Sequence, residues 1–130
     1  MATVTPFVYN AILERVVDGD TIDVTLDLGF NVKLHKQRCR LAGIDTPESR
    51  TRDLAEKALG KKASARLSEL CGEKLMIKSL GKGKYGRIFA IPYTEDGQDI
   101  CQMLIKEGHA VEYWGGTKKA KVRDDGTWGE

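Results

Sequence analysis

Three short segments of the sequence place carboxylates beside arginines, the residue types needed to cut a phosphodiester bond. Residues 18–21 read Asp-Gly-Asp-Thr, residues 40–48 read Arg-Leu-Ala-Gly-Ile-Asp-Thr-Pro-Glu, and residues 84–87 read Lys-Tyr-Gly-Arg. Carboxylate oxygens can hold a hard metal ion, a spare carboxylate can accept a proton, and guanidinium groups pair with phosphate oxygens. The combination predicts a phosphodiester hydrolase.

The first segment has a structural interpretation beside the functional one. Asp-Gly between two strands is a hairpin signal, and an aspartate there usually only shapes the turn. This explains Asp18 and Gly19 but leaves Asp20, at the head of the next strand, without a role. A carboxylate on a strand end has rigid support, so Asp20 is a candidate metal ligand.

The second segment is also open to two interpretations. Thr46-Pro47 is typical of a helix start, with the threonine as N-cap. In the functional interpretation, Pro47 fixes the backbone and holds Asp45 and Glu48 in one orientation. Asp45 and Asp20 then share one cation, and Glu48 lies slightly further out as the candidate general base.

The arginines and the glycine-rich loop 81–86 have alternatives of the same kind. Arg40 and Arg87 could form surface salt bridges, which contribute little to stability. Paired with a metal ion, they would instead stabilise the negative charge that develops on a phosphate during hydrolysis. The loop could be a simple connection, but Lys84 and Tyr85 also suit a contact to a terminal phosphate.

The cysteines and histidines argue against a zinc site and against a disulfide framework. Cys39, Cys71 and Cys101 are widely spaced, and the histidines are His35 and His109. No Cys-x-x-Cys pair occurs, so we expect buried free thiols. A functional metal would have to be held by oxygen, which favours Ca²⁺ or Mg²⁺.

The composition is that of one globular domain. The chain has 130 residues, of which 41% are hydrophobic and 31% charged, with a net charge of +2. This weak charge does not predict a nucleic-acid partner, although basic residues gather at 33–40 and 78–87. No apolar run approaches the roughly 20 residues that span a bilayer, and the start lacks a signal peptide. We therefore expect a cytoplasmic, monomeric protein without a membrane partner.

The first part of the chain reads as strands. Residues 8–17 are one candidate, and apolar residues alternate with polar ones from residue 22 onward. The alternation predicts an antiparallel hairpin over 20–41. Its parity switches near 35–37, which predicts a β-bulge that would re-aim Arg40.

Two helices and two further strands follow. Asp53 is a candidate N-cap with Glu56 as its capping-box partner, and Gly72 fits the end of this helix. A second helix is expected from Asp99 to Gly108. The two strands are expected at 74–80 and 87–93.

Five strands with a helix between the third and fourth is the order of an OB-fold barrel. The predicted fold class is α+β, mainly β, a five-stranded OB-fold barrel with two helices. We expect a single domain over 1–130, with its core at about 8–114 and an irregular tail at 115–130.

The segments at 18–21, 40–48 and 84–87 resemble, in order and approximate spacing, the signature of the staphylococcal nuclease (thermonuclease) family. The resemblance runs from about Ala11 to Trp114. It implies an OB barrel with added helices. It also implies calcium-dependent hydrolysis of DNA and RNA with little sequence preference, leaving 3′-phosphate and 5′-hydroxyl ends.

The resemblance also implies a role for each matching residue. Asp20 and Asp45 correspond to the calcium carboxylates, and Thr46 corresponds to the residue whose backbone carbonyl binds the ion. Glu48 corresponds to the carboxylate that activates water. Arg40 and Arg87 correspond to the pair of arginines that clamps the phosphate. Lys84 and Tyr85 correspond to residues that contact a neighbouring phosphate.

Some positions differ from the family, and others cannot be aligned with one particular family residue. Gly83 replaces an acid of well-known members, and residues 118–130 are too few for their long third helix. Trp128 is interpreted as a remnant of the packing anchor of that helix. Tyr113 and Trp114 lie near the family's stacking tyrosines, so base stacking and ordinary packing are both open for them.

Two rival functions remain at this stage. The same fold occurs as a catalytically inactive module, but such copies are expected to lose ligands or arginines, and this chain keeps them. A plain OB-fold single-strand binder needs basic and aromatic residues on its face. It has no need of carboxylates beside the phosphate site.

Overall fold

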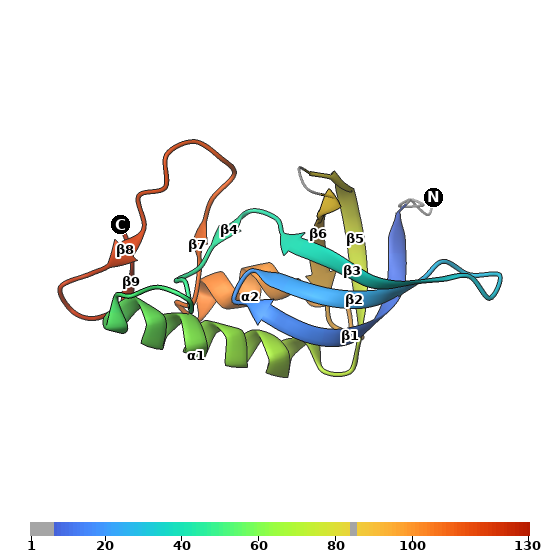
Figure 1. Ribbon diagram of the computed structural model, residues 1–130, viewed down its shortest axis with the longest axis horizontal. Coiled ribbons are helices and arrows are strands. Elements are labelled where there is room, and N and C mark those ends of the chain that lie inside the picture. Colours follow the sequence, from blue (N-terminus) through green and yellow to red (C-terminus); the bar gives the residue numbers. More distant parts are fainter. Residues whose placement is uncertain (1–6, 84–85) are drawn as a thin grey trace.

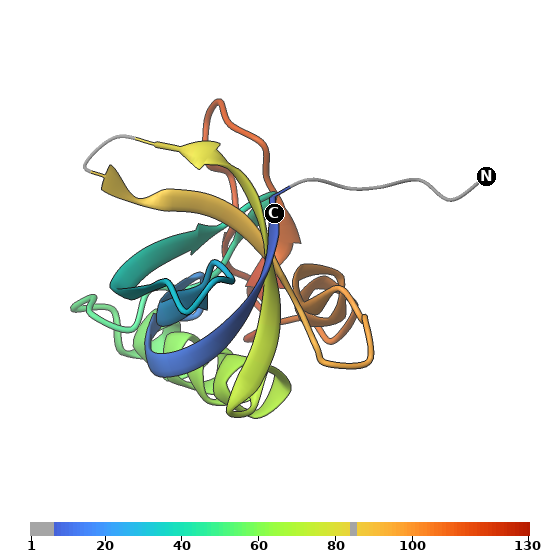
Figure 2. The ribbon, with the colours of Figure 1, turned by 90° about the vertical axis from the view of Figure 1, so that its right-hand side faces the viewer.

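Five strands of the computed structural model, which describes residues 7–83 and 86–130, close into a barrel (Figures 1 and 2). The barrel order is β1-β2-β3-β6-β5, and the pairs are antiparallel except for the parallel pair β3–β6. This confirms the predicted OB-type barrel. The barrel strands are β1 Val8–Asp18, β2 Thr21–Asp27, β3 Lys33–Leu41, β5 Lys74–Lys82 and β6 Ile88–Tyr93.

The predicted bulge is present in the long β2–β3 hairpin. The register of β2 against β3 shifts between Val24 and Leu26, and Lys36 has a φ of 56°. The Glu14 carboxylate stabilises this irregularity by accepting a hydrogen bond from the Lys36 N–H at 2.7 Å. Beyond the bulge, Cys39 is fully buried while Arg40 stays partly exposed. The bulge therefore sets which face of β3 carries the arginine.

Helix α1 (Leu54–Cys71) begins where the sequence predicts, but its expected capping box is wrong. The Asp53 carboxylate accepts hydrogen bonds from the Ala55 and Glu56 N–H groups. The Glu56 carboxylate does not return to Asp53. It accepts the Glu48 N–H at 3.0 Å instead. The loop before the helix folds back over the first turn, and this brings an unpaired backbone donor within reach of Glu56.

Gly60 explains how this loop can lie so close to α1. A Cβ at this helical position would lie 2.6 Å from the backbone carbonyl of Glu48 and the N of Ser49. Glycine in a helix interior normally costs about 1 kcal/mol relative to alanine. Here its missing side chain lets the helix touch the backbone that carries Glu48.

Helix α2 (Ile100–Lys106) also follows the prediction. The Asp99 carboxylate caps it by accepting the Gln102 N–H at 3.1 Å, and the chain leaves the helix through Gly108 with a φ of 83°. The helix packs against α1 and β6. A short pair, β4 (Ile44–Asp45) with β7 (Val111–Glu112), then links the segment after β3 to the segment after α2.

The segment 115–130, expected to be irregular, contains a small hairpin (Figure 1). It pairs β8 (Lys121–Val122) with β9 (Trp128–Gly129). Strands of two residues are too short to produce a visible alternation, so the pattern could not indicate them. Trp128 is only 7% exposed, and its side chain holds the hairpin against the body of the protein.

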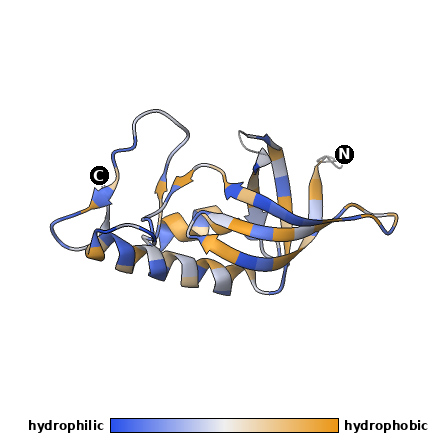
Figure 3. Cartoon of the chain, viewed as in Figure 1, coloured by the Kyte–Doolittle hydropathy of each residue, from blue (hydrophilic) through white to orange (hydrophobic). Residues whose placement is uncertain are grey.

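The core lies inside the barrel and between the barrel and the helices. Figure 3 shows apolar segments along the barrel strands and the helices. All three cysteines are buried free thiols, as predicted. Burial raises the pKa of Cys39 and of Cys71 to about 12 and raises that of Cys101 as well. The largest fully buried side chains include Ile22, Leu41, Ile44, Leu67, Leu75, Ile77, Ile100 and Leu104.

Neither α1 nor α2 has the length and apolar character that a membrane-crossing helix requires.

Candidate active site

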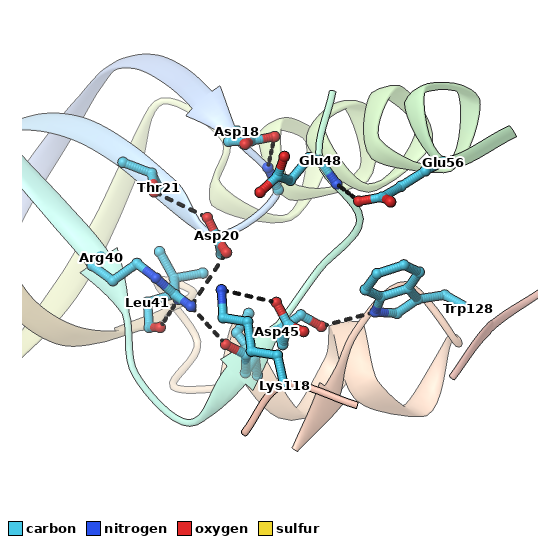
Figure 4. A network of polar contacts seen from close by, with 12 residues as sticks. Asp18, Asp20, Thr21, Arg40, Leu41, Asp45, Glu48, Glu56, Lys118 and Trp128 are labelled. Atoms are coloured by element: carbon cyan, nitrogen blue, oxygen red, sulfur yellow. Dashed lines mark hydrogen bonds and ion pairs between the residues drawn. The ribbon is translucent and has the colours of Figure 1, made fainter. Parts of the chain in front are cut away.

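Two of the predicted carboxylates and one arginine meet at the end of the barrel where β2, β3 and β4 converge (Figure 4). Asp20 lies in the tight turn between β1 and β2, Arg40 lies near the end of β3, and Asp45 lies in β4. The Leu41 N–H donates to the Asp20 carbonyl at 2.8 Å, which ties the turn to β3. The hairpin and the short β4 strand therefore position these three side chains.

Arg40 is held in place by both charge and backbone. Its Nη2 lies 3.3 Å from Asp20 Oδ2 and donates to the Ile44 carbonyl at 2.9 Å. Its Nη1 donates to the Leu41 carbonyl. The Arg40 and Asp20 side chains are only 17% and 16% exposed. The guanidinium is thus oriented beforehand, and little side-chain freedom remains to be lost when an anion binds.

Asp45 is the most deeply buried acid of the group, with only 6% of the residue exposed. Burial raises the pKa of Asp45 above its ordinary value, and the charge of Asp20 raises it further, while Lys118 and Arg40 oppose the change. Lys118 Nζ lies 3.6 Å from Asp45 Oδ1. Lys118 and Arg40 offset only part of the cost of ionising Asp45 in this position, and a bound metal ion would offset more of it.

The donors around Asp45 fit a hard divalent cation. Asp20 and Asp45 offer carboxylate oxygens, and Thr46 is buried directly after Asp45. Thr46 Oγ1 is itself buried without a hydrogen-bond partner in the described part of the chain. Residues 7–83 and 86–130 contain no group of three or more His, Cys, Asp or Glu side chains arranged for a metal. The remaining ligands would have to be carbonyls and water, which Ca²⁺ accepts.

Glu48 is exposed in the loop after β4, and its backbone is fixed from two sides. Its N–H donates to Glu56 on α1. The next residue, Ser49, donates through Oγ to Asp18 Oδ1 at 3.0 Å, and the same oxygen accepts the Gly19 N–H at 3.0 Å. Asp18 therefore does more than shape its turn, because it ties the loop of Glu48 to the turn of Asp20.

Arg87 lies on the outer face of the barrel, immediately before β6. It lines an open groove with Arg38 and Asp23. In the parallel β3–β6 pair, Arg40 is opposite Phe89, so Arg87 is about two residues away from Arg40 along the strands. Lys84 and Tyr85, the other predicted phosphate contacts, lie outside the described residues.

The two predicted stacking residues occupy the loop after β7. The Trp114 ring packs over Gly43, where an added Cβ would lie 2.5 Å from a ring atom, yet the residue is 65% exposed. The Tyr113 hydroxyl donates to the Gly116 carbonyl at 2.7 Å, and Lys118 Nζ lies 5.6 Å from the centre of its ring. Trp114 therefore has one packed ring face and a large open surface.

A family model described as staphylococcal nuclease homologue matches residues 38–126, more than half of the chain. The chain belongs to this family. The match includes Arg40, Asp45, Glu48 and Arg87 but begins after the turn of Asp20.

Individual relatives extend the similarity. The chain is 36% identical over 105 residues to "Endonuclease YncB" of Bacillus subtilis, covering 78% of this chain and 46% of the relative. It is 38% identical over 102 residues to "SPbeta prophage-derived endonuclease YokF" of the same organism, covering 75% and 32%. "Micrococcal nuclease" of Shigella flexneri is 32% identical over 108 residues, covering 76% and 55%. The chain thus spans about half or less of the length of these relatives.

Sequence reasoning gave no site role to Lys118 or Trp128. Lys118 reaches the Asp45 carboxylate, and Trp128 Nε1 donates to the Asp45 carbonyl at 3.1 Å (Figure 4). Both lie in the segment expected to be irregular. A lone tryptophan in a polar tail is a signal for a buried anchor, but no pattern in the sequence indicates which backbone group it binds.

Proposed function

We propose that this chain is a calcium-dependent nuclease that hydrolyses DNA and RNA with little sequence preference. The observation that best supports the proposal is that a buried Asp45, whose pKa is raised, lies in one site with Arg40, whose guanidinium is already oriented. Membership of the family and the names of the relatives, which are nucleases, support the same class of reaction. We also propose that the chain acts as a monomeric single domain.

Asp20, Asp45 and the backbone carbonyl of Thr46 would hold the ion. One Ca²⁺ fits better than Mg²⁺, because a site with two carboxylates, a carbonyl and water suits the larger, more flexible ion. When bound, the ion supplies positive charge that polarises the phosphate. Arg40 is already hydrogen-bonded to the backbone, so it would meet the phosphate without rearranging.

Glu48 is the proposed general base. Its backbone is fixed through Glu56 and the Ser49–Asp18 contact, whereas its side chain is exposed to incoming water. Glu48 would accept a proton from the attacking water as the new O–P bond forms. The bond from phosphorus to the 5′ oxygen would break, and the departing 5′ oxygen would take up a proton from solvent water, which leaves a 3′-phosphate and a 5′-hydroxyl. Arg87 would stabilise the charge that develops on the phosphate oxygens.

A non-catalytic nucleic-acid-binding module is the alternative. One observation favours it: Arg40 and Lys118 already lie beside Asp20 and Asp45, so part of the carboxylate charge is balanced without a metal ion. Such a module would bind nucleic acid equally well in Ca²⁺ and in chelator, and it would leave strand length unchanged.

The deciding experiment follows the length and end groups of single-stranded DNA and RNA in Ca²⁺, in Mg²⁺ and in excess chelator. We expect cleavage in Ca²⁺, weak cleavage in Mg²⁺ and none in chelator, with 3′-phosphate products. Glu48→Gln should lower kcat by about 10²–10⁴ while keeping substrate binding, because it removes only the base. Glu69→Gln, which removes an exposed acid of α1, is the matched control. Undiminished cutting in chelator, or a wild-type rate for Glu48→Gln, would reject the mechanism.

A further inference from the structure

An open groove of about 1030 Å³ lies on the outer face of the barrel, outside the carboxylate site. Four basic side chains and two acidic ones line it. The bases are Arg15, Lys36, Arg38 and Arg87, and the acids are Glu14 and Asp23. A groove with excess positive charge attracts anions. A basic groove that runs along a sheet suits the backbone of a single nucleic-acid strand.

The Asp23 carboxylate contacts two of these arginines. Arg38 makes a bidentate contact, with Nε 2.9 Å from Oδ1 and Nη2 3.1 Å from Oδ2, and Arg15 Nε lies 3.5 Å from Oδ2. The Asp23 side chain is only 17% exposed, whereas those of Arg38 and Arg15 are 47% and 58% exposed. The carboxylate is covered, and the guanidinium groups face solvent.

This arrangement differs from an isolated surface ion pair. One carboxylate can neutralise one guanidinium, so two guanidinium groups on Asp23 leave positive charge on the surface. Glu14 is the second acid of the groove. Its carboxylate is directed at the bulge, where it accepts hydrogen bonds from the Thr25 hydroxyl and the Lys36 N–H. The contact to Asp23 also fixes the orientation of Arg38, whose remaining terminal nitrogen, Nη1, can donate to another anion.

The groove continues the candidate active site along the strands. Arg38 and Arg40 are two residues apart on β3 and therefore lie on the same outer face, separated by about 7 Å. Arg87 belongs to both places, because it lines the groove and is a proposed phosphate ligand. A strand whose scissile phosphate meets Arg40 would carry its next phosphates past Arg38.

We propose that this groove is a second phosphate subsite, in which Arg38 and Arg15 bind the backbone of nucleotides adjacent to the scissile bond. The identity of the ligand as a nucleic-acid strand rests on the proposed nuclease function. The subsite makes binding depend on strand length, since a dinucleotide cannot fill both places. The contacts are to phosphate, so they do not add sequence preference.

The test compares Arg38→Gln with Arg66→Gln. Arg66 is a matched control because it also makes a bidentate contact to a carboxylate, with Nε 2.6 Å and Nη2 3.0 Å from Glu107, but it lies on α1. Both substitutions remove one positive charge and one bidentate ion pair, and Arg66→Gln also removes the contact from Arg66 Nη1 to Glu69 at 3.3 Å. Arg15→Gln, which breaks only the longer contact to Asp23, serves as a second variant if Arg38→Gln folds poorly in urea denaturation.

Steady-state cleavage in Ca²⁺ is measured on a dinucleotide and on an oligothymidylate of about ten nucleotides, within the site size of an OB fold. Arg38→Gln should lower kcat/KM about tenfold on the long strand and less than about twofold on the dinucleotide. The slope of log KM against log salt on the long strand should fall by about one. Arg66→Gln should change neither kcat/KM nor the salt dependence of KM. An equal loss on both substrates, or no loss on either, would overturn the subsite.

Binding of the same fluorescent oligothymidylate by anisotropy, in chelator, separates this proposal from the nuclease function. If the wild-type protein cuts and Arg38→Gln shows no length-dependent loss, the subsite is wrong and the function stands. In the other case, the wild-type protein does not cut the strand. If Arg38→Gln then weakens binding about tenfold and Arg66→Gln does not, the nuclease function is wrong and the groove stands as a nucleic-acid-binding site.

Discussion

At the scale of single residues, the site combines an arginine fixed by backbone carbonyls with a carboxyl group whose ionised form is disfavoured by burial. Arg40 is held in position before any ligand arrives. Asp45 is different, because burial and the neighbouring Asp20 both raise its pKa. The fold thus bears an electrostatic cost at Asp45 that a bound cation would relieve.

Asp45→Asn should therefore be at least as stable as the wild-type protein when no divalent ion is present. A raised folded-state pKa means that ionisation of Asp45 opposes folding above its unfolded pKa, and asparagine removes that ionisation. Ca²⁺ should raise the Tm of the wild-type protein and leave that of the variant unchanged. Thermal unfolding in chelator and in Ca²⁺ measures both effects. An equal rise of Tm in the two proteins would remove Asp45 from the metal site.

At the scale of elements, close contact between α1 and the loop after β4 sets the position of Glu48. The contact depends on Gly60 and on the bond from the Glu48 N–H to Glu56. The sequence predicted the helix and its N-cap, because these depend on neighbouring residues. It assigned Glu56 the wrong partner, because capping rules consider only the helix and not a loop that folds back onto it.

Gly60→Ala should destabilise the protein, although alanine is normally the better helix residue by about 1 kcal/mol. The added Cβ would lie 2.6 Å from the Glu48 backbone, so the loop or the helix must move. We expect a loss of about 1–3 kcal/mol in urea denaturation, as for other overpacked sites, together with reduced cleavage. Lys61→Ala, at the next and exposed position, should change stability by less than about 0.5 kcal/mol. A Gly60→Ala variant more stable than wild type would contradict this packing.

The Asp23–Arg38 pair gives a prediction for pH. The hydrogen bond from Arg38 lowers the pKa of Asp23 below the ordinary value of 3.8. The pair therefore contributes stability above that value and loses it as the pH falls through the lower, folded-state pKa. Asp23→Asn should cost at most about 1 kcal/mol at neutral pH, since Arg38 is half exposed, and less at about pH 3. Urea denaturation at the two pH values tests this, with Asp124→Asn as a charge-matched control. A difference that stayed constant with pH would exclude the ion pair as its cause.

At the scale of the whole molecule, the candidate site is assembled from segments that are distant in the sequence. Alternation predicted the strands and the bulge, and the signature segments predicted Asp20, Arg40 and Asp45 as partners. The pattern could not predict Lys118 or Trp128, because their contacts to Asp45 come from tertiary packing of a tail with few apolar residues. The same limit applies to Arg38, because the sequence shows only that basic residues gather at 33–40, whereas the folded barrel places Arg38 in one groove with Arg87.

The C-terminal hairpin is joined to the site through one buried hydrogen bond, from Trp128 Nε1 to the Asp45 carbonyl. That carbonyl belongs to the peptide between Asp45 and Thr46, two of the three residues proposed to bind the ion. Trp128→Phe keeps a large apolar ring but leaves the buried carbonyl without its donor, which should cost about 1–3 kcal/mol of stability. It should also loosen the orientation of both ligands.

We therefore expect Trp128→Phe to weaken Ca²⁺ binding about 10–100-fold, the range found when groups that orient metal ligands are lost. Trp114→Phe is the matched control, because it also removes an indole N–H hydrogen bond, the one from Nε1 to Glu112, but from an exposed ring. Calorimetric titration with Ca²⁺, at a temperature where both variants are folded, compares their affinities. Unchanged Ca²⁺ affinity in Trp128→Phe, together with the expected loss of stability, would show that the hairpin supports the fold without orienting the metal site.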